Sequence, residues 1–214
     1  MNEIKYLLFD AANTLIHKPS LWGMINAALA KNNITVNSET LQKNHKLISE
    51  LMVFPDRTSA EFYKKFNSEL LYSLGIIPNE KILADIFDSC TYLDWEPFED
   101  SAALSGISLP KGIVSNFNST LSEKINKIFS GTFSHIITSE EIGCAKPADE
   151  FYAKAIAIIN EKPENILYVG DSIKLDMEPA LKSGMKTYLI DRINCFPGYP
   201  DRIASLYQLP GINN

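Results

Sequence analysis

The stretch Ile4-Lys5-Tyr6-Leu7-Leu8-Phe9-Asp10-Ala11-Ala12-Asn13-Thr14-Leu15 decides how the rest of this chain can fold. Tyr6–Phe9 is a nearly unbroken apolar run, which is typical of a strand buried on both faces in a parallel sheet. The run ends at Asp10, and small residues that favour a turn follow it. Open α/β sheets bind their ligands at the carboxyl ends of the strands. Asp10 is therefore a candidate functional residue.

The C-terminal part of the chain repeats this pattern of short apolar runs, each separated from the next by a stretch with helical spacing. The predicted strands are Lys111–Asn116, His135–Thr138, Ile166–Val169 and Lys186–Ile190. Strands that alternate with helices indicate right-handed crossovers and a parallel sheet. We predict an α/β fold with a doubly wound parallel sheet. The proline-rich end is expected to be mostly loop, with a short helix near Ile203.

Residues 17–95 follow a different pattern, because their apolar residues recur with helical spacing and no strand is indicated. Ser20 is a candidate N-cap for the first of four helices, and Ser38 opens the second. Thr58 and Glu61 have the spacing of a capping box before the third helix, which Gly75 ends. We predict a four-helix cap at 17–95, inserted into a core formed by 1–16 and 96–214.

Composition excludes several classes of function. The chain has 214 residues, of which 45% are hydrophobic and 21% charged, and its net charge is −6. It has no basic stripe, so nucleic acid is not an expected partner. It has no apolar run of membrane-spanning length, and its three widely spaced cysteines indicate neither a disulfide framework nor a zinc site. Because no leader-like segment precedes the first strand, we expect a cytosolic protein.

Polar side chains end or follow most of the predicted strands. Asp10 and Asp171 could hold Mg²⁺ through carboxylate oxygens, with water and a substrate phosphate completing the shell. Ser115 and the amides that follow it could hydrogen-bond phosphate oxygens at a helix N-terminus. Lys146 could neutralise charge on a phosphoryl group. In such a site Asp10 could attack phosphorus and form an aspartyl phosphate.

Four motifs, in this order, resemble those of the haloacid dehalogenase (HAD) superfamily of hydrolases. They are Leu8-Phe9-Asp10-Ala11-Ala12-Asn13-Thr14-Leu15, Val114-Ser115-Asn116, Lys146-Pro147, and Val169-Gly170-Asp171-Ser172 with Asp176. The resemblance covers essentially the whole chain, and the helical insert is similar to the cap that the family places between its first two motifs.

The resemblance implies a role for each of these motif residues. Asp10 would be the nucleophile, and Asp10, the Ala12 carbonyl and Asp171 would hold Mg²⁺. Asp176 would support the metal shell from outside it. Ser115, Asn116 and Lys146 would bind the phosphate of a small phosphorylated substrate. The implied activity is that of a Mg²⁺-dependent phosphatase.

One position departs from the family's phosphatases, which usually carry a second Asp two residues after the nucleophile. That Asp protonates the leaving oxygen and later activates water, whereas this chain has Ala12. General acid/base catalysis contributes about 10²–10⁴-fold in rate. We therefore expect slow turnover of ordinary phosphate esters and a preference for good leaving groups. His17, a side chain that titrates near neutrality, is a candidate replacement.

Two alternative functions stay open on this evidence. Relatives that cleave carbon–phosphorus or carbon–halogen bonds also lack the second Asp. The carbon–phosphorus branch needs a cap lysine that forms a Schiff base, for which Lys43 and Lys46 are the candidates. The other alternative is a binding or regulatory module that retains the fold with little catalysis.

Overall fold

Strand β1 (Tyr6–Phe9) lies inside the sheet of the computed structural model, which describes residues 3–209, and all four of its side chains are buried. The sheet has six strands in the order β5-β4-β1-β6-β7-β8, and its neighbouring strands pair in parallel. Its other strands are β4 (Lys111–Ser115), β5 (His135–Thr138), β6 (Ile166–Gly170), β7 (Lys186–Ile190) and β8 (Arg202–Ile203). This arrangement confirms the predicted α/β fold.

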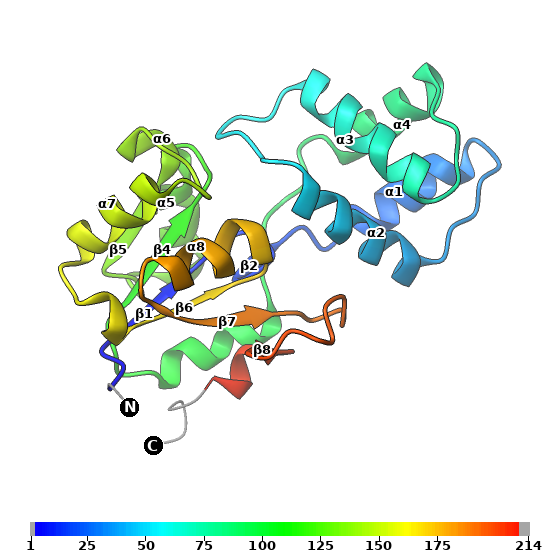
Figure 1. Cartoon of the computed structure of the whole chain (residues 1–214). Helices are drawn as coiled ribbons and strands as arrows, with labels where there is room; N and C mark the ends of the chain where they lie inside the picture. The colour runs from blue at the N-terminus through cyan, green and yellow to red at the C-terminus, as the bar shows by residue number, and fades with distance from the viewer. Residues whose placement is uncertain (1–2, 210–214) are drawn as a thin grey trace. The chain divides into compact units, whose positions relative to one another are not determined.

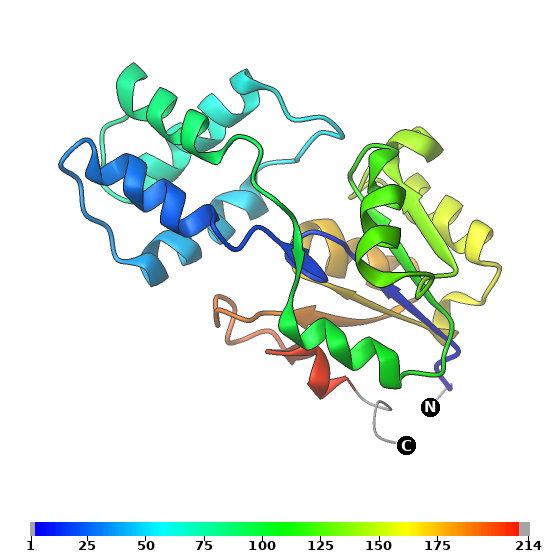
Figure 2. The same ribbon diagram turned by 180° about the vertical axis from the view of Figure 1, so that it is seen from behind.

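Helices cover both faces of this sheet, as the opposite views in Figures 1 and 2 show. On one face lie α7 (Asp149–Ile159) and α8 (Glu178–Lys182), and on the other lie α5 (Thr120–Phe129) and the 3-10 helix η1 (Glu99–Gly106). Shorter elements are α6 (Ser139–Ile142), η2 (Pro163–Asn165), the π turn η3 (Ile173–Met177) and η4 (Leu206–Gln208). Buried Phe151 and Tyr152 of α7 belong to the same apolar cluster as Leu8 and Tyr168 of the sheet. The sheet is thus doubly wound.

The register of the strands brings their carboxyl ends to one edge. Phe9 is aligned with Ile113 of β4 on one side and with Val169 of β6 on the other. The backbone N–H of Asp10 donates to the carbonyl of Val169 at 2.9 Å. Residues that directly follow these three strands therefore lie close together in space although they are far apart in sequence.

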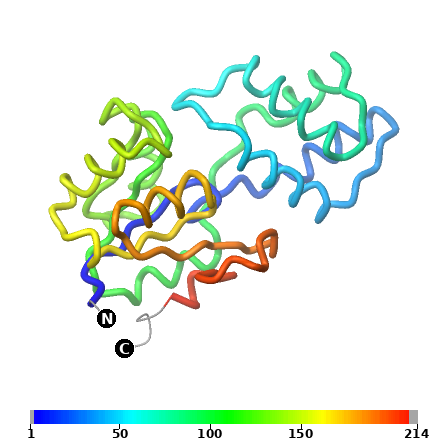
Figure 3. Tube along the Cα trace, viewed as in Figure 1, coloured from blue at the N-terminus to red at the C-terminus, as the bar shows by residue number. Residues whose placement is uncertain are grey.

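The chain divides into two compact units, Met1–His17 with Pro97–Asn214, and Lys18–Glu96. The second unit is a helical insertion, and Figure 3 traces the two connections through which the chain enters and leaves it. Its helices are α1 (Leu21–Ala30), α2 (Ser38–Leu51), α3 (Ala60–Ser73) and α4 (Glu80–Cys90). They enclose an apolar core of their own, which includes Leu29, Leu41, Phe66 and Ile86. At the connections, the short strands β2 (Ile16–His17) and β3 (Glu96–Pro97) form a two-stranded sheet.

Two local features differ from the prediction, each for a physical reason. The short helix expected near Ile203 is the turn Leu206–Gln208, whereas Ile203 itself lies in strand β8, which was not predicted, because it is buried and aligned with Ile190 of β7. The cap of α3 is Ser59 rather than Thr58, since the Ser59 hydroxyl accepts the N–H of Phe62 at 3.1 Å.

Other features of the helices follow the sequence. Gly75 ends α3 with a φ of 73°, as its lack of a side chain favours. Within residues 3–209, no helix is both long enough and apolar enough to cross a membrane.

Candidate active site

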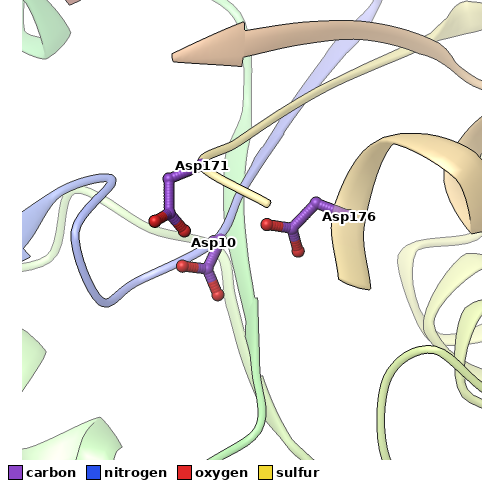
Figure 4. Close-up of side chains that lie close together, drawn as sticks. All are labelled: Asp10, Asp171 and Asp176. Atoms are coloured by element: carbon purple, nitrogen blue, oxygen red, sulfur yellow. The ribbon is translucent and has the colours of Figure 1, made fainter. Parts of the chain in front are cut away.

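Three carboxylates gather at the carboxyl edge of the sheet. Asp10 follows β1, Asp171 follows β6, and Asp176 lies in η3. One oxygen from each lies within 4.8 Å of the others, and Figure 4 shows the three side chains directed toward the same small space. Asp10 and Asp176 are buried and Asp171 is half-buried. The strand order therefore brings together the acidic residues that the sequence singles out.

Lys146 joins two of these carboxylates. Its ammonium nitrogen Nζ lies 2.6 Å from Oδ1 of Asp10 and 2.7 Å from Oδ1 of Asp176, and its side chain is only 3% exposed. Buried charges are tolerated when they are paired and hydrogen-bonded in this way. Lys146 thus holds the Asp10 carboxylate in a fixed orientation.

Asn116 holds the backbone of Lys146 in turn. Its side-chain Oδ1 accepts the Lys146 N–H at 2.7 Å, and its Nδ2 donates to the Lys146 carbonyl at 2.9 Å. Both polar atoms of the amide are engaged, so the side chain links the segment after β4 to the segment that carries Lys146. Ser115, the last residue of β4, is 3% exposed.

Asp176 is held by three hydrogen-bond donors. Its Oδ1 accepts the phenol of Tyr168 at 2.6 Å as well as the Lys146 ammonium, and its Oδ2 accepts the backbone N–H of Ser172 at 3.0 Å. Gly170 makes this placement possible, because a Cβ there would lie 2.5 Å from Oδ2 of Asp176. Asp176 therefore fixes Lys146, which in turn contacts Asp10.

Burial and crowding of like charges control protonation here. Burial raises the pKa of Asp10 to about 7; Lys146 opposes this shift, and the neighbouring Asp176 and Asp171 add to it. Burial by itself would lower the pKa of Lys146, but Asp10 and Asp176 outweigh it and raise that pKa above its usual value. Burial, together with the charge on Asp176, also keeps the pKa of Tyr168 well above normal, so the phenol remains a hydrogen-bond donor.

The donor set fits a hard divalent cation. When ionised, the three carboxylates carry more negative charge than the Lys146 ammonium, which bridges two of them, can balance. Oxygen ligands of this kind suit Mg²⁺, which binds through one or two carboxylates and keeps several waters. Asp10 and Asp171 are the two candidate ligands predicted from the sequence that the fold brings together.

The loop after Asp10 is a tight turn closed by its own hydrogen bonds. The N–H groups of Leu15 and Ile16 both donate to the Ala11 carbonyl, at 2.9 and 3.0 Å, and the Asn13 N–H donates to Ile16 at 2.7 Å. Asn13 has a φ of 61°, in the left-handed region that Asn tolerates better than most residues. The half-buried Ala12 lies within this turn.

His17, the candidate replacement acid/base, lies in β2 just beyond this loop. Its ring is stacked on that of Phe98, with centroids 4.0 Å apart and planes 12° apart. The stack holds the His17 ring in place, seven residues after the nucleophile in the sequence. A part for His17 in proton transfer stays a prediction.

Sequence reasoning missed two residues that organise the site. Tyr168 sits inside an apolar strand, and Arg192 lies in the loop after β7, where it donates to the carbonyls of Asn13 and Thr14. Tyr168 could have been noticed in the sequence, because it stands two residues before the Gly170-Asp171 pair at the end of the strand. Arg192 could not have been found in this way, because it contacts backbone carbonyls, which every residue carries whatever its side chain.

Comparison with known proteins agrees with this geometry. A family model described as a haloacid dehalogenase-like hydrolase matches residues 4–184. Glyceraldehyde 3-phosphate phosphatase from Methanopyrus kandleri is 26% identical over 208 residues, which cover 88% of this chain and 84% of that protein. Phosphoglycolate phosphatase from Aquifex aeolicus is 36% identical over 89 residues, or 41% of each chain.

Solved structures show the same fold at low sequence identity. The magnesium-bound HAD-hydrolase YfnB from Bacillus subtilis has a TM-score of 0.64 and 19% identity, with 96% of each chain covered. A haloacid dehalogenase-like protein from Agrobacterium tumefaciens has a TM-score of 0.67 and 17% identity, with 98% of this chain and 97% of that chain covered.

Proposed function

Because the chain belongs to the haloacid dehalogenase-like hydrolase family, we propose that it is a Mg²⁺-dependent phosphatase of a small phosphorylated metabolite. The observation that carries this proposal is the Asp10 carboxylate, held by Lys146 at 2.6 Å beside two further carboxylates. Two of the relatives are named as phosphatases of glyceraldehyde 3-phosphate and of phosphoglycolate. Both names point to short phosphorylated molecules as the substrate class.

Asp10 is the proposed nucleophile. Its Oδ1 accepts the Lys146 hydrogen bond, so Oδ2 attacks phosphorus while the bond from phosphorus to the leaving oxygen breaks. The leaving oxygen departs with the electron pair, and the phosphoryl group stays on Asp10 as an acyl phosphate. Water then attacks this group, which releases inorganic phosphate and restores the carboxylate. Mg²⁺, when bound, supplies positive charge to the phosphoryl oxygens.

Ser115 and Lys146 are proposed to hold the transferring phosphoryl group. Both are buried, and Lys146 supplies a cation within hydrogen-bond distance of the nucleophile. Asn116 is part of the same site. Because its side-chain amide is engaged with Lys146, we propose that its contact with substrate comes through the backbone N–H.

Ala12 determines which leaving groups we expect the enzyme to accept. A methyl group can neither protonate a leaving alkoxide nor activate water, although the carbonyl of the same residue can still serve as a metal ligand. Without that acid/base, turnover of poor leaving groups falls by about 10²–10⁴-fold. We therefore propose a preference for acyl or aryl phosphates, unless His17 supplies the proton.

Ion pairs at both candidate lysines weaken the alternative of carbon–phosphorus bond cleavage. Lys43 lies 2.8 Å from Glu39, and Lys46 lies 3.0 Å from Glu50. Each candidate amine is thus engaged by a carboxylate of its own helix rather than held free for attack on a carbonyl. A carbon–halogen hydrolase works without metal, and the cluster of Asp10, Asp171 and Asp176 argues against that reading.

The test combines binding and turnover in the full chain. We expect Mg²⁺ with beryllofluoride to raise the melting temperature, and acetyl phosphate or an aryl phosphate to be hydrolysed with a transient phosphoenzyme in intact-mass spectra. Asp10→Asn is the matched control, and it should show neither turnover nor the covalent species. Stabilisation without hydrolysis would favour a binding module. No response in either assay would contradict the proposal.

A further inference from the structure

Arg192 makes an unusual set of contacts with the loop that follows the nucleophile. Its Nη1 donates to the carbonyl of Asn13 at 3.1 Å, and its Nη2 donates to the carbonyl of Thr14 at 3.0 Å and to Oδ1 of Asp100 at 2.7 Å. Arg192 lies after β7, beyond residues 4–184 that the family model matches. One side chain from the C-terminal segment thus binds two consecutive carbonyls of the first motif.

The guanidinium is itself held on two sides. Its central carbon lies 3.8 Å from the centroid of the Phe98 ring. His17 stacks on the same ring at 4.0 Å. Two groups this close to one centroid must occupy opposite faces, so Phe98 lies between them.

Asp100 anchors the other side of Arg192. It is 9% exposed, and its second oxygen, Oδ2, accepts the backbone N–H of Leu206 at 2.9 Å. The carboxylate therefore ties the guanidinium to η1, where Asp100 lies, and to the start of η4. Ring and carboxylate together fix the plane of the guanidinium, and hence the direction of its donors toward the loop.

We infer that Arg192 is a positioning residue that fixes the loop carrying Ala12 and thereby aligns Asp10 for reaction. It acts through the backbone of Asn13 and Thr14 rather than through substrate, and the inference rests on the proposed function. The planar fork of arginine can donate to two carbonyls and a carboxylate in one fixed geometry. A lysine at this position would keep the positive charge beside Asp100 but could not reproduce that geometry.

Amide hydrogen exchange tests the loop without any need for turnover. The amides of Asn13, Leu15 and Ile16 are hydrogen-bonded within the loop, so they should exchange slowly in the parent. In Arg192→Lys we expect their exchange to quicken by about tenfold, the effect of losing charge-assisted hydrogen bonds. Asp100→Asn, which retains the shape of the side chain but removes the ion pair, should give a smaller increase.

Arg202→Lys is the matched control, because Arg202 belongs to the same C-terminal segment but bonds Asp191 and Asn194 rather than the loop. It should leave loop exchange and turnover unchanged. For Arg192→Lys with an aryl phosphate, we expect kcat to fall about tenfold with little change in KM, since the aligned nucleophile matters in the transition state.

The outcomes separate this inference from the proposed function. Unchanged loop exchange in Arg192→Lys, or an equal increase in Arg202→Lys, would overturn the positioning role whether or not the parent hydrolyses phosphates. Faster loop exchange with an unchanged kcat would also overturn it, because the arginine would then be only a structural tie. A parent that neither binds beryllofluoride nor turns over phosphates would contradict the proposed function, and exchange would still decide whether Arg192 holds the loop.

Discussion

Gly170→Ala should disrupt the charged cluster by displacing Asp176. A Cβ at this position would lie 2.5 Å from Oδ2 of Asp176 and 2.6 Å from its Cβ and Cγ, whereas real Cβ atoms essentially never approach closer than 3.0 Å. Asp176 cannot swing away freely, because Lys146, Tyr168 and the Ser172 N–H all hold it. Its whole side chain must therefore shift, and those hydrogen bonds must lengthen.

The expected cost follows from these contacts. Overpacking a buried site costs about 1–3 kcal/mol, and weakening a hydrogen bond to a charged group costs about 1.5–3 kcal/mol. We expect Gly170→Ala to lower the free energy of unfolding by about 2.5–6 kcal/mol. It should also reduce the Mg²⁺-dependent rise in melting temperature, because Asp176 no longer fixes Lys146 and its neighbours.

Urea unfolding at neutral pH, with and without Mg²⁺, measures both effects. Gly198→Ala is the matched control, since a Cβ there meets nothing within 4 Å, and it should stay within about 0.5 kcal/mol of the parent. A Gly170→Ala protein as stable as this control, with an intact Mg²⁺ response, would refute the packing described here for Asp176.

Three further changes have expected outcomes. Asp171→Ala should remove the stabilisation by Mg²⁺, which is about 2.7 kcal/mol for a protein that binds the ion when its concentration is one hundred times Kd. An unchanged Mg²⁺-dependent rise in melting temperature would exclude Asp171 from the site. Ala12→Asp should shorten the life of the phosphoenzyme seen by intact mass and raise turnover by up to about 10²–10⁴-fold; no change would mean that another residue, with His17 the first to test, already acts as acid/base. Burial, with Lys46 adding to it, lowers the pKa of His45 from 6.5 to about 4, so the folded state stays neutral while the unfolded state takes up a proton. The free energy of unfolding should then fall as pH drops from about 6.5 toward 4. A shift of one pKa unit is worth about 1.36 kcal/mol, so the fall is at most about 3 kcal/mol, and the partial exposure of the ring makes it smaller. Urea unfolding of His45→Phe should show a shallower fall with pH, and an equal fall would contradict the assignment to His45.

The central strands could be predicted because the local pattern and the tertiary environment agree. The runs Tyr6–Phe9, His135–Thr138 and Lys186–Ile190 are strands with the predicted bounds. Each is short, mostly apolar and bounded by polar or small residues, as strands of a covered parallel sheet should be. Strand β8 could not be found this way, because two residues are too few to carry a period.

The acidic cluster was also accessible from sequence, since Asp10 and Asp171 follow strands whose order places them together. The contacts that hold the cluster in place were not. Asp176, which the sequence also singles out, owes its exact position to the missing side chain of Gly170 and to the phenol of Tyr168. Arg192 reaches the first motif from almost the other end of the chain, and contacts of this kind depend on the assembled fold rather than on local spacing.

The sheet order also has a consequence for how the chain folds. Leu7 of β1 is aligned with Lys111 of β4 and with Leu167 of β6, so β1 finds its two neighbours only after the helical insertion and then a further long stretch of chain have followed. Pairings this distant in sequence form slowly, because a long loop must be closed before they can contribute. Until β6 arrives, β1 has an open edge along an apolar strand, which is a site for association with other chains. A protein truncated before Ile166 should therefore aggregate, and one truncated within the helical insertion would carry β1 with no partner strand at all.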